Sequence, residues 1–349
     1  MNYFKAINKA RSFFVLLLIV NFTYPIEANN VIKVDGKYFT LNGQPFKMWG
    51  VRVASAAVTE SATSEFIAQL DEYKSYGINS FSVFLQGSSG ITVDPFNSTG
   101  TTIDQGVFDR TVRIIQECDK RGMVVVLGIF YQNVKQPTLK DWNSCRSAVR
   151  LVTENFKPYR NVIINIANEQ NSEQHLDKAW AKVNQVEGMI ELAKIVRKID
   201  PERIVGGGGF AYVNNLLLTR SSDIDVLLFD TFFATDNSEH WYDYLTGGKI
   251  EKPIVNVEML GYSTMFCKPQ GVFEPNKYYA DGKKEFTDEI DRALRNPGLN
   301  VFFHSTLWYQ GLSKGLPQHY DLGGMGTKED PGVRWYFEYL KERLAIKQN

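Results

Sequence analysis

The chain has 349 residues, and its 39 Lys and Arg residues balance 39 Asp and Glu residues, so the formal net charge is zero. A chain without excess charge has no basic field to draw nucleic acid, and we expect no nucleic-acid partner. The cysteines Cys118, Cys145 and Cys267 have a spacing that matches no metal cluster. We therefore expect no metal and no cofactor, and cysteines that are mostly buried and inert.

The first 28 residues have the pattern of an export signal. Lys5, Lys9 and Arg11 precede an apolar run at 13–20 that is too short to span a bilayer. We expect residues 1–28 to be a signal peptide and the protein to be periplasmic or extracellular. An uncleaved N-terminal anchor is the alternative, and no other membrane partner is expected. Residues 29–349 are predicted to form a single domain, of a size that suits one large α/β barrel.

After this segment, an Asp-Gly pair within residues 34–38 predicts a tight hairpin, which we place at the floor of the fold. Strands and amphipathic helices then alternate, as in a parallel α/β protein. The expected strands are 47–53, 78–85, 123–130, 161–167, 203–207, 225–230, 253–258 and 299–308. The expected helices lie near 62–76, 105–121, 139–157, 185–199, 212–219, 238–246, 284–296 and 331–346. This order predicts a closed (β/α)8 TIM barrel with a short N-terminal β-hairpin, rather than an open doubly wound sheet.

Local signals refine this outline. Residues 63–66 and 330–332 have the composition of helix starts, the latter with proline in the first turn. Four glycines, 206–209, follow the fifth expected strand without the spacing of a dinucleotide site or the lysine of a phosphate-binding loop. We expect these glycines to permit a close backbone approach or a bulge.

The most informative segment is 161–171, NVIINIANEQN, a near-continuous apolar run that stops at Asn168 and Glu169. Such a run is typical of a parallel strand covered on both faces. An amide and a carboxylate at the C-terminal end of a barrel strand are well placed for a catalytic site, because barrel enzymes carry their catalytic residues there. The alternative is a strand that merely exits into solvent at a polar turn.

A second expected strand ends in the same way. Residues 252–258, KPIVNVE, place Glu258 directly after an apolar run. Two glutamates on separate strand ends can face each other across a cleft, and glycoside hydrolysis needs such a pair, one as proton donor and one as nucleophile or base. Taken alone, Glu258 is equally compatible with a surface carboxylate.

The strand that carries Asn168 and Glu169 resembles the acid/base strand of the retaining glycoside hydrolases of clan A, of which family 5, the cellulase family, is the nearest. The lead-in at 39–51 is also similar to that of these barrels. The resemblance implies that Glu169 is the acid/base, Glu258 the nucleophile and Asn168 the hydrogen-bond partner of a sugar hydroxyl next to the cleavage point. It also implies that Trp308, in the expected eighth strand, is the floor under the reacting sugar, with a barrel-core tryptophan as the alternative.

The chain departs from the family pattern at several strand ends. Ser82 stands where these barrels usually carry an arginine near the nucleophile, and Arg52 at the end of the first strand is a candidate to supply the charge, with a structural ion pair as the alternative. Asp230 replaces a usual histidine of the sixth strand, and we expect it to bind sugar hydroxyls or to pair with Arg52. Tyr131 lies in the region after the third strand where another usual histidine is missing. It is a candidate for the wall of a sugar subsite, with a packing role as the alternative. For His304 we expect a satisfied structural role.

The sequence thus predicts a glycoside hydrolase that cleaves O-glycosidic bonds of an oligo- or polysaccharide with retention of configuration. The departures favour a divergent member that takes a different sugar at the cleavage point. Two other classes stay open. One is a non-catalytic carbohydrate-binding barrel, against which the two glutamates argue. The other is a metal-dependent lyase or isomerase barrel, for which Asp230 and His304 are too few ligands.

Overall fold

The computed structural model describes residues 30–88, 90–231, 237–259, 281–306, 308–310, 318–327 and 329–348. The expected signal peptide and Cys267 lie outside these residues, so the predictions made for them are not addressed by the fold.

A small antiparallel sheet precedes the barrel. It consists of β1 (Ile32–Asp35), β2 (Tyr38–Leu41) and β3 (Gln44–Phe46), and the hairpin predicted between β1 and β2 is confirmed. Ile32 and Phe39 belong to the same apolar cluster as Val124 and Ile163, which lie at the beginnings of two barrel strands. The sheet therefore covers the N-terminal end of the barrel, as expected.

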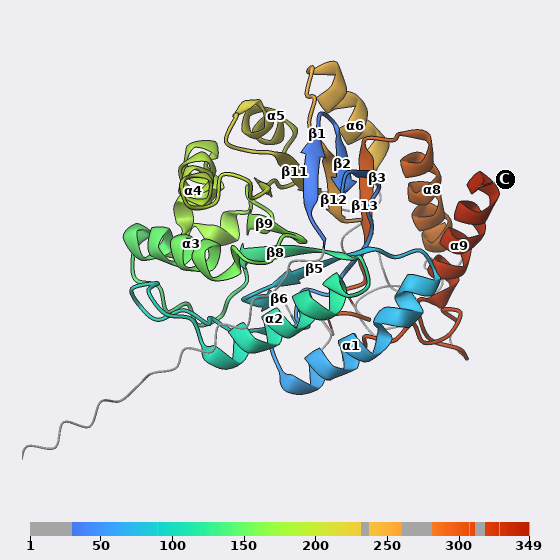
Figure 1. Ribbon diagram of the computed structural model, residues 1–349, viewed down its shortest axis with the longest axis horizontal. Coiled ribbons are helices and arrows are strands. Elements are labelled where there is room, and N and C mark those ends of the chain that lie inside the picture. Colours follow the sequence, from blue (N-terminus) through green and yellow to red (C-terminus); the bar gives the residue numbers. More distant parts are fainter. Residues whose placement is uncertain are drawn as a thin grey trace, which may run out of the picture.

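The described residues form one closed barrel of parallel strands, which confirms the predicted (β/α)8 fold (Figure 1). The barrel strands are β4 (Trp49–Arg52), β5 (Ser80–Phe84), β8 (Val124–Phe130), β9 (Val162–Ala167), β10 (Val205–Gly207), β11 (Val226–Asp230), β12 (Ile254–Glu258) and β13 (Leu299–Phe303). Each strand pairs with the next in chain order, and β13 pairs with β4 to close the ring. A short ribbon of β6 (Gly87–Ser88) and β7 (Ile91–Thr92) follows β5.

Helices surround the strands (Figure 1). They are α1 (Glu60–Ser75), α2 (Gln105–Asp119), α3 (Trp142–Phe156), α4 (Val186–Ile199), α5 (Tyr212–Arg220), α6 (Ser238–Gly247), α8 (Asp281–Arg295) and α9 (Arg334–Gln348), with short 3-10 helices η1 (Glu173–His175) and η2 (Ala181–Asn184). Side-chain caps fix several helix starts: Thr59, Asp104 and Asp141 each accept a backbone N–H from the first turn of α1, α2 and α3.

Apolar side chains fill the space inside the barrel and the layer between strands and helices. Val257 and Phe302 belong to the interior cluster, whereas Ile254 belongs to the outer one. Leu228 is also interior, so Asp230, two residues later, points to the same side of its strand. His304 stands in the same relation to Phe302. Strand alternation therefore carries polar side chains into the C-terminal mouth of the barrel.

Each predicted strand and helix has a counterpart, but several boundaries were wrong. The eighth strand ends at Phe303, and Trp308 lies beyond it in a turn. The polar residues His304, Ser305 and Thr306 directly follow Phe303, and the prediction extended the strand across them to the aromatic residue at 308. Helix α1 begins earlier than predicted, after its cap Thr59. Helix α9 begins later than predicted, because Gly332 first forms a bridge with Gly323.

The glycine run confirms the expected close approach. A Cβ added to Gly206 would lie 2.4 Å from the backbone oxygen of Val226, and one on Gly208 would lie 2.5 Å from that of Leu228. These distances are far inside van der Waals contact, so β10 packs this tightly against β11 only because it carries glycine.

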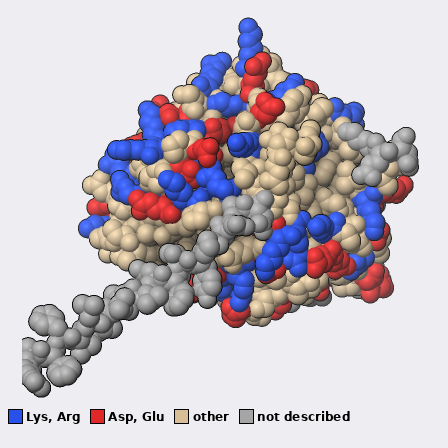
Figure 2. All heavy atoms as spheres, in the orientation of Figure 1, with Lys and Arg blue, Asp and Glu red and all other residues tan. Residues whose placement is uncertain are grey.

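The surface and the cysteines match the expectations from composition. Figure 2 shows Lys and Arg intermixed with Asp and Glu on the face in view. None of the described helices is long and apolar enough to cross a membrane. Cys118 and Cys145 are buried and unpaired, and burial raises the pKa of both thiols, which keeps them protonated.

Candidate active site

Glu169 and Glu258 both lie at the C-terminal end of the barrel. Glu258 is the last residue of β12, and Glu169 follows the end of β9. The backbone of Glu169 has a φ of 43°, a conformation that is rare for a residue with a side chain and concentrates at functional sites. The turn is fixed by neighbouring strands: Asn168 N–H donates to Phe130 O at 2.9 Å, and Gln170 N–H donates to Gly208 O at 2.8 Å.

Arg52 joins the two strand ends across the mouth of the barrel. Its buried guanidinium donates from Nη1 to Oδ1 of Asn168 at 2.9 Å, and the same nitrogen lies 3.2 Å from Oε2 of Glu258. The second contact is an ion pair without hydrogen-bond alignment. Burial acts to lower the pKa of Arg52, but the surrounding acids, Glu258 foremost, raise it above its usual value. The structure thus brings together Arg52, Asn168 and Glu258.

The charge of Glu258 acts on the pKa of Glu169. Burial and then the charge of Glu258 raise the pKa of Glu169 to about 8, while Arg52 and a hydrogen bond from Gln132 act in the opposite direction. Burial also raises the pKa of Glu258, and Arg52 opposes that shift. Because Arg52 is the direct ion-pair partner of Glu258, the arrangement favours a charged Glu258 beside a protonated Glu169 at neutral pH.

Asp230 is the register partner of Glu258 on the neighbouring strand β11. Its side chain is buried, and neither carboxyl oxygen has a hydrogen-bond partner in the described part of the chain. Burial and the charges of Glu258 and Glu169 raise the pKa of Asp230 well above its usual range. Arg52 and the Glu169 backbone N–H act against that shift, the latter without reaching hydrogen-bond geometry. The expected alternative of an ion pair with Arg52 is wrong in this structure, because Arg52 pairs with Glu258 and neither Asp230 oxygen has a hydrogen-bond partner among the described residues.

His304 differs from its expected structural role. The ring is buried, with Nε2 at 3.4 Å from Oε1 of Glu258, whereas Arg52 lies 3.2 Å from Oε2. Neither ring nitrogen has a hydrogen-bond partner among the described residues. Burial and the charge of Arg52 hold the pKa of His304 well below its usual value, so the imidazole is neutral. The expectation of a satisfied histidine was wrong because sequence gives no indication of which groups face a strand end.

Two site residues escaped the sequence analysis. Gln132, after β8, accepts a hydrogen bond from Nδ2 of Asn168 at 3.0 Å and holds the Asn168 amide in place together with Arg52. His175 in η1 lies 2.8 Å from the backbone oxygen of Asn168 through Nε2. A carbonyl only accepts, so this nitrogen carries the proton. Burial lowers the pKa of His175 to about 4, which keeps the ring neutral. The available signal for Gln132 was its position directly after an apolar strand.

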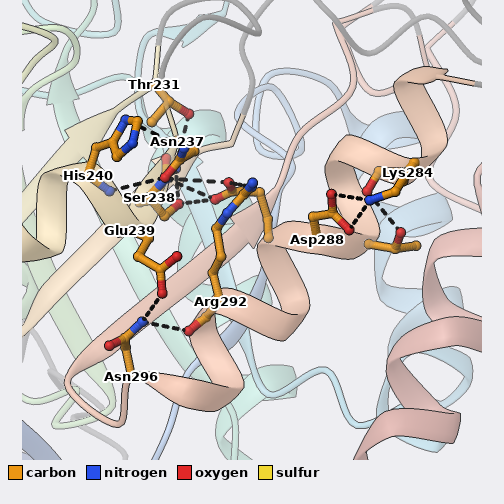
Figure 3. A network of polar contacts seen from close by, with 12 residues as sticks. Thr231, Asn237, Ser238, Glu239, His240, Lys284, Asp288, Arg292 and Asn296 are labelled. Carbon is orange, nitrogen blue, oxygen red and sulfur yellow. Dashed lines mark hydrogen bonds and ion pairs between the residues drawn. The ribbon is translucent and has the colours of Figure 1, made fainter.

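A buried polar chain connects Glu258 to the helix layer, and Figure 3 shows its helical end with Ser238 and Arg292. The Glu258 backbone N–H donates to Oδ1 of Asn256 at 3.2 Å, and the Asn256 amide donates to Oγ of Ser238 at 2.7 Å, at the start of α6. Ser238 in turn donates to the buried carboxylate of Glu289 on α8, which also pairs with Arg292 at 2.5 Å. The end of β12 is therefore tied to two helices, which limits the movement of Glu258.

The aromatic candidates Trp308 and Tyr131 are both buried. Trp308 is almost fully buried, with Nε1 donating to Asp321 O at 2.8 Å and the ring stacked on His319 at 4.2 Å. The structure thus holds one face of this ring against protein. Tyr131 is buried against Phe84 in an edge-to-face contact, so packing accounts for most of its ring. Within the described ranges, no group of three or more His, Cys, Asp or Glu residues is placed to hold a metal ion.

Comparison with known proteins gives a family match. The model of the cellulase family, glycosyl hydrolase family 5, matches residues 39–244. No curated protein sequence matches this chain significantly.

Solved structures resemble the fold. An endo-1,4-β-mannanase from Rhizomucor miehei is 14% identical with a TM-score of 0.63, over 89% of this chain and 99% of that one. A family 5 glycoside hydrolase from Bacteroides vulgatus is 15% identical with a TM-score of 0.65, over 93% of this chain and 72% of that one. A β-mannanase from the blue mussel Mytilus edulis is 15% identical with a TM-score of 0.57, over 84% and 99%. At such identities the likeness concerns the fold.

Proposed function

Because the chain belongs to the cellulase family, glycosyl hydrolase family 5, and is a glycosidase, we propose that it cleaves O-glycosidic bonds of an oligo- or polysaccharide by a retaining double displacement. Glu258 is the nucleophile and Glu169 the acid/base. The observation that carries this assignment is the ion pair of Glu258 with Arg52, at 3.2 Å. Glu169 has no ion-pair partner among the described residues, and its pKa is raised to about 8.

In the first step a carboxylate oxygen of Glu258 attacks the anomeric carbon, and the bond from that carbon to the leaving oxygen breaks. Glu169 gives its proton to the leaving oxygen, so the first product departs as an alcohol and Glu169 becomes a carboxylate. The new ester removes the negative charge of Glu258. Since that charge is the second-largest cause of the raised pKa of Glu169, its loss favours the ionised form of Glu169 as the base for the next step.

In the second step Glu169 takes a proton from water, the water oxygen bonds to the anomeric carbon, and the ester bond to Glu258 breaks. Two inversions give net retention. Throughout, Arg52 compensates the negative charge of Glu258 in the free enzyme and on the returning carboxylate. Arg52 also donates a hydrogen bond to Asn168, whose amide is proposed to bind a sugar hydroxyl. Asp230 is proposed to accept hydrogen bonds from further hydroxyls, and Trp308 and Tyr131 to border the sugar.

The test is the configuration of the first product. The purified protein is incubated with 2,4-dinitrophenyl glycosides of glucose, mannose and galactose in both anomeric forms, and the released sugar is followed by proton NMR before mutarotation. We expect hydrolysis of at least one glycoside, with the product in the anomeric form of the substrate. A product of opposite configuration would contradict the double displacement. Glu258→Gln serves as the matched control and should show no turnover.

We also propose that the protein is exported, which rests on Lys5, Lys9 and Arg11 ahead of the apolar run at 13–20. The full chain is expressed in a bacterial host, the cells are fractionated, and the N-terminus of the recovered protein is sequenced. A protein found outside the cytoplasm and beginning after residue 28 supports a cleaved signal. An intact N-terminus in the membrane fraction supports an anchor, and an intact protein in the cytoplasm contradicts export.

A further inference from the structure

Glu258 is contacted on both carboxylate oxygens, by two different kinds of group. Arg52 lies 3.2 Å from Oε2, and Nε2 of His304 lies 3.4 Å from Oε1. The two groups come from β4 and from the end of β13, the strands that follow β12 around the barrel. Asp230 on β11 and Glu169 after β9 face Glu258 from the other side, and both are acids. Among these four groups around Glu258, His304 is the one that is neither a carboxyl group nor a permanent cation.

A packing role does not account for the imidazole. The ring is fully buried and neither nitrogen is hydrogen bonded within the described chain. Burying a polar ring without partners costs free energy that a phenylalanine or leucine in the same space would not cost. Nε2 nevertheless lies 3.4 Å from Oε1 of Glu258, so a small rotation of either side chain would complete a hydrogen bond to the carboxylate.

We propose that His304 is a positioning residue for the nucleophile: its neutral imidazole donates from Nε2 to Oε1 and holds the plane of the Glu258 carboxylate while Arg52 holds the charge. The inference rests on the proposed role of Glu258. A neutral donor suits this task because a second cation would stabilise the carboxylate charge that attack on the sugar must consume. A hydrogen bond fixes orientation, and small errors in the orientation of a nucleophile are costly in rate.

The variants His304→Phe and His304→Gln separate orientation from packing. Phenylalanine keeps a planar ring and removes the donor, whereas glutamine keeps an N–H at a similar reach. Asn300→Ala is the matched control on the same strand. The Asn300 side chain bonds to Met48 N–H and Ile254 O at the opposite end of the barrel, so this change should lower Tm without touching the site.

The primary measurement is the rate constant for covalent labelling by a 2-deoxy-2-fluoro glycoside with a dinitrophenolate leaving group, detected by intact-protein mass. The sugar is the one hydrolysed by the wild type. We expect His304→Phe to slow labelling about 10²-fold without loss of Tm, and His304→Gln to recover most of that loss. Because a hydrogen bond to the charged form lowers the pKa of a carboxyl, the acid limb of the pH profile of kcat/KM should move to higher pH in His304→Phe. Asn300→Ala should keep the labelling rate and the acid limb of the wild type.

Labelling of His304→Phe at the wild-type rate with an unmoved acid limb would overturn the proposal. The proposal would also be overturned if labelling slowed in proportion to a loss of Tm, and to the same degree in His304→Phe and Asn300→Ala. The ring of His304 would then only fill space. Absence of label on the wild-type protein, while the glycoside is turned over, would contradict the role of Glu258 itself. The two failures are therefore distinguishable.

Discussion

Arg52 on β4 and Ser82 on β5 are direct partners in the register of the barrel. Residues paired in this way present their side chains on the same face of the sheet. Barrels of this family usually carry an arginine where Ser82 stands, and here the guanidinium enters the same region from the neighbouring strand. Its Nη1 reaches both Asn168 and Glu258, and its charge lies over the ring of Phe84 at 5.1 Å.

Removing this charge should impair catalysis more than folding. In Arg52→Met we expect kcat/KM to fall about 10²-fold or more, because a preorganised charge at the reacting group is lost. The acid limb of the pH profile of kcat/KM should also move to higher pH, since Arg52 lowers the pKa of Glu258. Steady-state kinetics and circular dichroism check both parts. Near wild-type activity would mean that Arg52 is only structural.

The register makes it possible to move the arginine from β4 to the neighbouring strand β5. Arg52→Ser combined with Ser82→Arg returns the guanidinium to the strand on which related barrels carry it. We expect kcat/KM of this double variant to be at least about tenfold higher than that of Arg52→Ser, because the charge is restored beside Glu258. Ser82→Arg alone, with two guanidinium groups competing for one space, is the control. No recovery in the double variant would show that the site requires the arginine on β4.

The raised pKa of Glu169 predicts the alkaline limb of activity. The protonated acid is required for departure of the leaving group, so kcat/KM should fall as the pH rises through about 8. In Glu169→Gln, assayed with a dinitrophenyl glycoside whose departure needs little protonation, this limb should disappear. Persistence of the same limb in Glu169→Gln would assign it to another group.

The same shift has a consequence for stability. The pKa of Glu169 in the folded protein, about 8, lies above its ordinary value of 4.5. The folded state therefore binds this proton more tightly than the unfolded state. The stability this provides is fully present below 4.5 and is lost as the pH rises through about 8. Glu169→Gln never ionises, so its Tm should exceed that of the wild type above pH 8, by about 2–4 °C per kcal/mol. A difference in Tm that does not depend on pH would contradict this reasoning.

Asp230 is predicted to act on substrate and not on the fold. Its carboxyl makes no hydrogen bond in the described chain, so Asp230→Asn should leave Tm unchanged or higher. If the group binds sugar hydroxyls, KM should rise about tenfold or more with a smaller change in kcat. Thermal unfolding measures the effect on Tm, and steady-state kinetics on the glycoside that the wild type hydrolyses fastest measure KM and kcat. Unchanged KM would remove Asp230 from the substrate contacts.

The sequence predicted the parts of this fold that depend on local patterns. The apolar runs ending at Glu169 and Glu258 identified two strand ends, because parallel strands buried on both faces are nearly free of polar residues. Arg52 was singled out differently, because Ser82 stands where the resembling barrels usually carry an arginine and Arg52 lies at the end of the neighbouring strand. The end of β13 was placed too late, because the prediction extended the strand across the polar residues 304–306 to Trp308.

The contacts across the barrel mouth were beyond such patterns. Gln132, His304 and Asn256 are polar residues at or near strand ends with no motif of their own. Their roles depend on which side chains from distant strands face them. The expected pairing of Asp230 with Arg52 failed for the same reason. The guanidinium contacts Asn168 and Glu258, a choice that strand order alone does not predict.

The assignment of the two glutamates is tested most directly by azide rescue of their alanine variants, with the configuration of the azido product read by NMR on a dinitrophenyl glycoside. Glu169→Ala still forms the glycosyl-enzyme with Glu258, and azide then attacks it without a general base, so the product should retain the configuration of the substrate. Glu258→Ala forms no covalent intermediate, so azide in the vacated space should give the inverted product. Exchange of the two outcomes would reverse the roles, and full activity of both variants without azide would contradict the mechanism.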